Sequence, residues 1–260
     1  MHELGEICFE HDGARLFAVE QGHGLAVIIA HGGLANHQAA RLFAAPLADR
    51  HRLITPDLRG SGRSVDPRPL SWQRLADDVV ALLDHLRIER AVVGGISFGA
   101  GVAVATALRH PRRVRALVVL HPAFADAETG LEPQQVAAMQ TMDDMGQRTL
   151  HDGIAALFPL LDTLPVELRE RARATVATYD PASVAATTRL LASGTFPFAR
   201  AAELHALAVP TLLVPGIDPY HPPSIAAVFR DHVAACTVRE VETPALPATI
   251  AAFLDELPQS

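Results

Sequence analysis

A serine between two glycines is the first feature of this chain that could do chemistry. The pattern G-x-S-x-G occurs at Gly95-Ile96-Ser97-Phe98-Gly99, after the apolar run 91–94 and before a helical stretch at 100–109. A serine at a sharp strand-to-helix turn exposes its hydroxyl, and the helix N-terminus behind it favours developing negative charge. The pattern predicts that Ser97 is a nucleophile. The alternative interpretation is a glycine-rich turn with an incidental serine.

The elements that would position this serine follow from short apolar runs that alternate with helical patterns. Runs of this kind, each separated from the next by a helix, are typical of a parallel sheet covered on both faces. We therefore predict an α/β fold, in which ligands bind beyond the carboxyl ends of the strands. The predicted strands are a hairpin (6–10 and 15–20) followed by 26–30, 52–56, 91–94, 114–120, 211–214 and 237–241.

The strand alternation stops between about residues 122 and 207, where only helical patterns occur. The predicted helices of this part are 134–145, 150–161, 166–179 and 181–191. We interpret 123–207 as a helical cap that is inserted into a core formed by 1–122 and 208–260.

Three motifs in this order resemble those of the α/β-hydrolase fold family, and the resemblance covers nearly the whole chain. His31-Gly32-Gly33 follows one predicted strand, 57–64 reads D-x-R-G-x-G-x-S after the next, and Ser97 occupies the nucleophile position. The resemblance implies a mostly parallel central sheet with helices on both faces, an inserted helical cap and a serine hydrolase activity.

The same resemblance implies the partners of Ser97. The backbone N–H groups of Phe98 and Gly33 would hold a tetrahedral oxyanion, with Leu34 as the adjacent alternative, and the loss of one such donor typically costs roughly 10²–10³ in turnover. The acid is expected after the strand 211–214. Asp218 lies there in a loop similar to the family's G-x-x-D-P but one residue shorter. The alternative interpretation of Asp218 is an Asx-turn residue.

The expected base is missing from its usual place. The family's histidine should lie between the last strand and the last helix, and 242–247 contains none. A serine hydroxyl is a poor nucleophile without a base. The candidate substitutes are His221, three residues after Asp218, and His121, at the end of a predicted strand, where it is also a candidate binding residue. The alternatives are a turn residue for His221 and a cap-hinge residue for His121.

Composition excludes several other classes of protein. All 22 basic residues are Arg, so chemistry that needs a Lys, such as Walker-A phosphate binding or Schiff-base formation, is excluded. A net charge of −7 argues against a nucleic-acid partner. The uncharged stretch 91–108 contains Ser97 and four glycines, which suits a strand that turns into a helix better than a membrane span.

The cysteines and the N-terminus indicate the compartment. Cys8 and Cys236 lie far apart without metal-ligand spacing, so we expect free, buried thiols and neither a metal nor a cofactor. The acidic start of the chain lacks the pattern of a secretory signal. We therefore expect a cytoplasmic protein, as a monomer or homodimer, with a small-molecule substrate.

These observations predict a serine hydrolase that acts through Ser97 on a small or medium carboxylic ester or related acyl substrate. One alternative is a catalytically impaired relative that binds a ligand or performs a non-hydrolytic, cofactor-free reaction, because the usual histidine is missing. Another is a variant with weak residual activity. The distance from Ser97 Oγ to the nearest histidine nitrogen separates these cases, because a base must come within about 2.6–3.2 Å, or one water, of the proton it takes.

Overall fold

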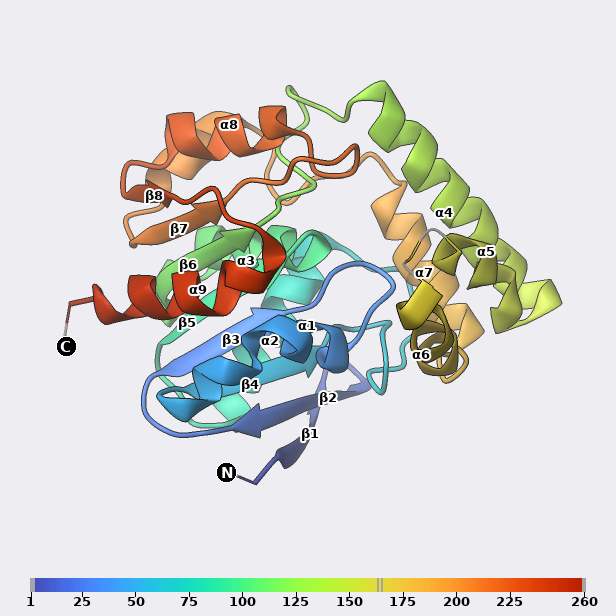
Figure 1. The fold of residues 1–260 in the computed structure, drawn as a ribbon, viewed down its shortest axis with the longest axis horizontal. Coiled ribbons are helices and arrows are strands. Elements are labelled where there is room, and N and C mark those ends of the chain that lie inside the picture. The colour runs from blue at the N-terminus through green and yellow to red at the C-terminus, as the bar shows by residue number, and fades with distance from the viewer. Residues whose placement is uncertain (1–2, 163, 165, 259–260) are drawn as a thin grey trace.

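The computed structural model describes residues 3–162, 164 and 166–258. Its strands form an eight-stranded sheet in the order β1-β2-β4-β3-β5-β6-β7-β8 (Figure 1). The pairs β1/β2 and β2/β4 are antiparallel, and the other neighbours are parallel, which confirms the predicted fold class. The strands are β1 (Gly5–His11), β2 (Ala14–Gln21), β3 (Ala26–Ala30), β4 (Arg52–Asp57), β5 (Ala91–Ile96), β6 (Val114–Leu120), β7 (Thr211–Val214) and β8 (Cys236–Val238).

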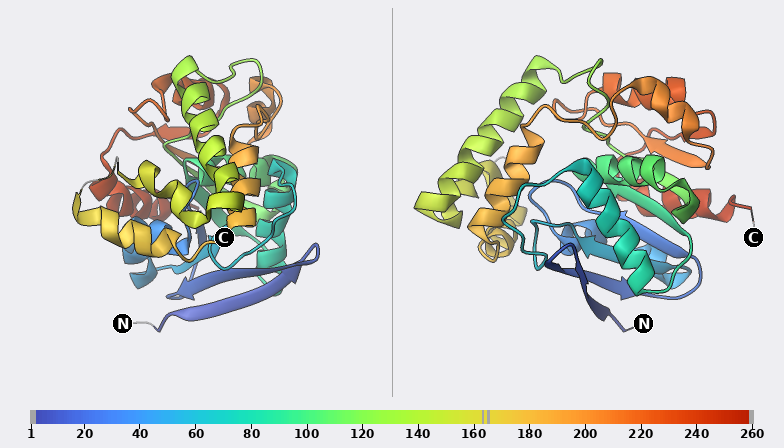
Figure 2. Two further views of the ribbon diagram at one scale, coloured as in Figure 1. Left: turned by 90° about the vertical axis from the view of Figure 1, so that its right-hand side faces the viewer. Right: turned by 180° about the vertical axis from the view of Figure 1, so that it is seen from behind.

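Helices cover both faces of the sheet, and alternate residues of each strand serve the two faces. Ile28 of β3 belongs to the apolar cluster on the side of α2, α3 and α8, whereas Ile29 belongs to the cluster on the side of α1 and α9. Figure 1 views the face with α1 and α9, and the right-hand view of Figure 2 shows the opposite face. The helices are α1 (His37–Ala44) with η1 (Ala45–Asp49), α2 (Trp72–His85), α3 (Phe98–Arg109) with η2 (Pro111–Arg113), α8 (Pro223–His232), and η5 (Thr243–Ala245) with α9 (Leu246–Asp255).

The short η4 (Ala201–Ala206) packs against α3 and α8, whereas the helices α4 to α7 of the chain between β6 and β7 lie together beyond one end of the sheet (Figure 1). The helices η3, α6 and α7 share a small apolar cluster around Leu157, Val176 and Tyr179, against which Leu34 of the β3–α1 loop also packs. The division into a core and a cap over 123–207 stays a prediction. The elements are α4 (Pro133–Asp152), η3 (Ile154–Leu157), α5 (Phe158–Leu161), α6 (Val166–Val176), α7 (Pro181–Leu191) and η4 (Ala201–Ala206).

Three local expectations were wrong. The predicted helix 150–161 does not exist as one unit, because α4 continues to Asp152 and Gly153, at φ 76°, ends it. The last strand covers 236–238 instead of 237–241. Cys8 is exposed, since it alternates with the buried Ile7 and Phe9 along the edge strand β1.

Among the described residues, no helix is both long enough and apolar enough to cross a bilayer.

Candidate active site

Ser97 lies at the junction of β5 and α3 in a strained backbone conformation. Its φ of 56° and ψ of −115° fall outside the regions that L-residues normally adopt. Close backbone packing maintains the turn, because a Cβ on Gly95 would collide with the backbone of Gly99, and a Cβ on Gly99 would come within 2.5 Å of the carbonyl oxygen of His31. Both glycines of the G-x-S-x-G pattern are therefore required by space, and strain of this kind is common at functional sites.

The structure brings Ser97, His221 and Asp218 together. His221 Nε2 lies 2.8 Å from Ser97 Oγ, and His221 Nδ1 lies 2.9 Å from each carboxylate oxygen of Asp218. A nucleophile, a base within hydrogen-bond distance of it and a third group that orients the base are the arrangement that activates a serine. Their catalytic roles stay predictions, and the geometry is compatible with all three.

The loop between β7 and α8 holds both His221 and Asp218. Asp218 Oδ1 accepts the backbone N–H groups of Tyr220, at 2.8 Å, and of His221, at 3.1 Å. The loop folds tightly because Gly216 lies against His221, where any Cβ would collide with the histidine. Asp218 is thus an Asx-turn residue and a partner of His221 at once.

The Asp218 side chain remains 49% exposed. Partial burial acts to raise the pKa of Asp218, but the hydrogen bond and charge of His221, with the N–H groups of Tyr220 and His221, outweigh it and hold this pKa below its ordinary value. Asp218 is therefore ionised at neutral pH and aligned to stabilise a protonated His221.

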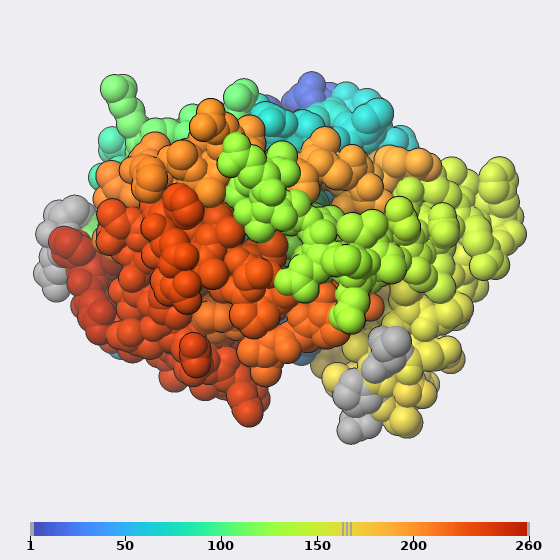
Figure 3. All heavy atoms as spheres, turned by 90° about the horizontal axis from the view of Figure 1, so that it is seen from above, coloured from blue at the N-terminus to red at the C-terminus, as the bar shows by residue number. Residues whose placement is uncertain are grey.

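A buried glutamine of α4 anchors this loop, and the sequence analysis missed it. Gln135 Nε2 donates to the backbone oxygens of Tyr220, at 3.0 Å, and of Ala123, at 3.1 Å, while its Oε1 accepts the N–H of Glu132. Viewed from above, the green α4 and the orange-to-red C-terminal segment lie side by side (Figure 3). Glu132 and Gln135 have the spacing of a capping box, which was the one available signal, but it reveals nothing about the contact with Tyr220.

The β3–α1 loop, which carries the predicted oxyanion donors Gly33 and Leu34, lies beside Ser97 and Phe98. A Cβ on Gly32 would lie 3.6 Å from Ser97 Cβ, and a Cβ on Gly33 would lie 3.9 Å from Phe98 Cβ. The backbone N–H groups of Gly33, Leu34 and Phe98 donate to no other described residue. These free donors suit an incoming oxyanion, a role that stays a prediction.

His31 shapes the loop that carries two of these donors. Its Nδ1 lies 2.7 Å from the carbonyl oxygen of Gly32, and its Nε2 lies 3.0 Å from the backbone nitrogen of Leu58. The first contact needs a proton on Nδ1 and the second needs a lone pair on Nε2, so the ring is neutral. Complete burial lowers the pKa of His31, which is consistent with that state.

We expect the free energy of unfolding to fall between pH 7.5 and pH 5.5, with His31 responsible for part of the fall. Its folded pKa lies below the ordinary value of 6.5, so the unfolded chain takes up a proton first as the pH drops, which favours unfolding. Urea unfolding of wild type and His31→Gln at both pH values measures this, because glutamine keeps one donor and one acceptor and does not titrate. Equal losses in the two proteins would contradict the assignment.

His121, the second candidate base, lies at the end of β6 with φ 42°. Its ring centroid is 6.2 Å from that of His221, and it makes no hydrogen bond with Ser97. Burial, followed by the nearby charge of His221, lowers the pKa of His121. The structure thus places His121 beside the candidate base, and its role in binding stays a prediction.

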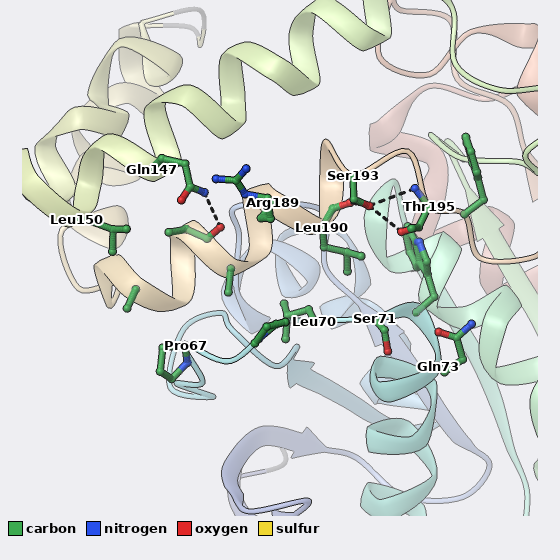
Figure 4. A pocket seen from close by; sticks show the side chains of 16 residues that line it. Pro67, Leu70, Ser71, Gln73, Gln147, Leu150, Arg189, Leu190, Ser193 and Thr195 are labelled. Carbon is green, nitrogen blue, oxygen red and sulfur yellow. Dashed lines mark hydrogen bonds between the residues drawn. The ribbon is translucent and has the colours of Figure 1, made fainter.

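Two pockets lie near this part of the fold. One, of about 560 Å³, is lined by Ser97 and His221. Another, of about 530 Å³, lies between 67–73 and α7 and is lined by neither Ser97 nor His221 (Figure 4).

Among the described residues, no group of three or more His, Cys, Asp or Glu side chains is placed to hold a metal ion.

Comparison with known proteins defines the class. The model of the α/β hydrolase fold family matches residues 26–230, and the chain therefore belongs to this family. The curated relatives include the 2-hydroxymuconate semialdehyde hydrolase of Pseudomonas sp. (strain CF600), which is 39% identical over 113 residues, or 42% of this chain and 40% of that enzyme. The chain spans about two fifths of the length of the first curated relatives that it matches.

Solved structures share the fold over almost the whole chain. The thermophilic esterase from Thermogutta terrifontis has a TM-score of 0.76 at 23% identity, and the alignment covers 97% of this chain and 96% of the esterase. The enol-lactonase from Burkholderia xenovorans LB400 has a TM-score of 0.79 at 20% identity, covering 96% and 100% of the two chains. At these identities the likeness establishes the fold alone.

Proposed function

We propose that this protein is a serine hydrolase that cleaves a small or medium carboxylic ester, or a related acyl substrate, through Ser97. The observation that carries the proposal is the 2.8 Å separation of His221 Nε2 from Ser97 Oγ. The curated relatives support it, because they include a 2-hydroxymuconate semialdehyde hydrolase, an epoxide hydrolase and two carbamate hydrolases described as putative.

In the proposed mechanism, Ser97 Oγ attacks the carbonyl carbon while its proton passes to His221 Nε2. The N–H groups of Phe98 and Gly33 hold the tetrahedral oxyanion, and Asp218 stabilises the imidazolium through Nδ1. Collapse of this intermediate breaks the ester bond, and the departing alcohol takes the proton from Nε2. A water molecule then loses a proton to His221, attacks the acyl-enzyme and releases the acid with Ser97 restored.

The helices of 123–207 are proposed as a cap over this site. Leu191 of α7 supports this, because its Cδ1 lies 3.1 Å from the position of a Cβ on Gly33. Gln135 also links α4 to the loop of His221. A cap placed in this way excludes water from part of the site and limits the substrate to a small molecule.

The alternative of a ligand-binding or non-hydrolytic protein had one motivating observation, the absence of a histidine in 242–247. That absence carries little weight when His221 lies within hydrogen-bond distance of Ser97.

Hydrolysis of p-nitrophenyl acetate and butyrate tests the proposal. We expect turnover above the buffer rate, and loss of that turnover after one equivalent of a fluorophosphonate has reacted per chain. The proposal is wrong if the protein hydrolyses neither ester and does not react with the probe. A small ligand that binds tightly in a thermal-shift screen without being turned over would then favour the alternative.

A further inference from the structure

The pocket that contains Ser97 and His221 is built from the sheet-bearing part of the chain. Its other walls are the β3–α1 loop, the outer side of α1 and the segment 243–247 ahead of α9. Within 123–207, no residue that the structure describes is among its lining residues. A substituent of a substrate bound at Ser97 therefore has room to extend along this pocket without entering the space between the sheet and the helices α4–α7.

The walls of this pocket are apolar and uncharged. In the described part of the chain no Asp, Glu or Arg lines it, and its polar side chains are Ser97, His221 and Thr243. Two wall residues of the last segment are prolines, which have no backbone N–H to offer a polar ligand. The apolar wall residues that carry the argument are Ala39, Leu42 and Phe43 of α1, with Pro244 and Pro247 opposite.

The α1 wall exposes apolar surface at the pocket. Leu42 is 68% exposed although its neighbour Phe43 is buried in the core. Ala39 is half-buried and leaves the pocket open, because its side chain is a single methyl group. An exposed Leu alone is ordinary, but here it borders a cavity that reaches the reactive hydroxyl.

The segment 243–247 stands where the family resemblance implied a catalytic histidine. His221 approaches Ser97 from the loop after β7 instead. Thr243 and Pro244 consequently contribute a pocket wall and no base.

We propose that this pocket binds an uncharged, apolar substituent of the ester, on either the acyl or the alcohol side of the reacting carbonyl. The inference rests on the proposed function and names its substrate class. A volume of about 560 Å³ is within the usual range for small-ligand sites and has room for a chain of several carbons. Each methylene that becomes buried there should raise kcat/KM by roughly four-fold until the chain reaches the rim.

The test is the ratio of kcat/KM for p-nitrophenyl hexanoate to that for p-nitrophenyl acetate in three variants. Ala39→Trp fills the pocket, and Thr243→Asp places a charge in its exposed wall without disturbing the core. Ala186→Trp is the matched control, because Ala186 is also a half-buried alanine on a helix but lines the separate pocket beside α7.

We expect Ala39→Trp and Thr243→Asp each to lower this ratio by at least about ten-fold, roughly the loss of two buried methylenes, and Ala186→Trp to leave it within two-fold of wild type. A second series, ethyl to hexyl acetate, identifies the side: if its ratio falls instead of the acyl ratio, the pocket holds the alcohol. The inference is overturned if both ratios are unchanged in both pocket variants while wild type hydrolyses esters. If wild type hydrolyses no ester, the proposed function itself fails.

Discussion

Replacing His221 with alanine should lower kcat for p-nitrophenyl butyrate by about 10⁴–10⁶-fold, the range seen when a histidine base is removed from a serine triad. The reason is the contact between Nε2 and Ser97 Oγ, because nothing else within hydrogen-bond distance of that hydroxyl accepts its proton among the described residues. Steady-state and single-turnover kinetics of the purified variant provide the measurement.

His121→Ala is the control, since His121 is also a histidine and lies close to His221 but makes no hydrogen bond with Ser97. The kcat of this variant should fall by less than about ten-fold, because only the orientation of groups in the site would change. Added imidazole should restore part of the activity of His221→Ala, which loss of a purely structural residue would not allow. Equal losses in both variants, with no rescue, would mean that His221 is not the base.

Asp218→Asn should lower kcat by about 10²–10⁴-fold through the tautomer of His221. Asparagine keeps an acceptor oxygen for the N–H groups of Tyr220 and His221, so the loop should stay folded. Its amide, however, would donate to Nδ1 and leave the proton on Nε2, which then cannot accept from Ser97. The loss should be smaller than for His221→Ala, because the Asp218 side chain is 49% exposed and its charge is partly screened.

The matched check on this variant is the Asp218→Glu substitution, which retains a carboxylate. Its kcat should be at least about ten-fold higher than that of Asp218→Asn if the charge at position 218 and the tautomer of His221 matter. Full activity in Asp218→Asn, with unchanged stability, would mean that Asp218 serves only as an Asx-turn residue.

Local patterns were sufficient to predict the sheet and the position of Ser97. Buried parallel strands appear as continuous apolar runs, and β3 to β7 all begin at their predicted first residues. The turn at Ser97 was also predictable from the sequence, because its pattern has glycines at positions 95 and 99, where the structure leaves no room for a Cβ.

The base was harder to predict, because its position depends on the path of a short loop. The sequence did not distinguish His221 from His121 as the base, because the two residues follow neighbouring strands, β7 and β6, at the carboxyl end of the sheet. The choice depends on how Gly216 and the Asx turn at Asp218 bend the chain, and on the anchor that Gln135 supplies from a helix 85 residues away from Tyr220. No pattern within the loop itself encodes that last contact.

The central claim is that Ser97 is the nucleophile and that His221 activates it. Peptide mass spectrometry after timed exposure to a fluorophosphonate tests both parts in wild type and His221→Ala. We predict one adduct per chain, on Ser97, forming at least about 10³-fold more slowly in the variant. An adduct on another residue, or equal labelling rates in the two proteins, would contradict the account.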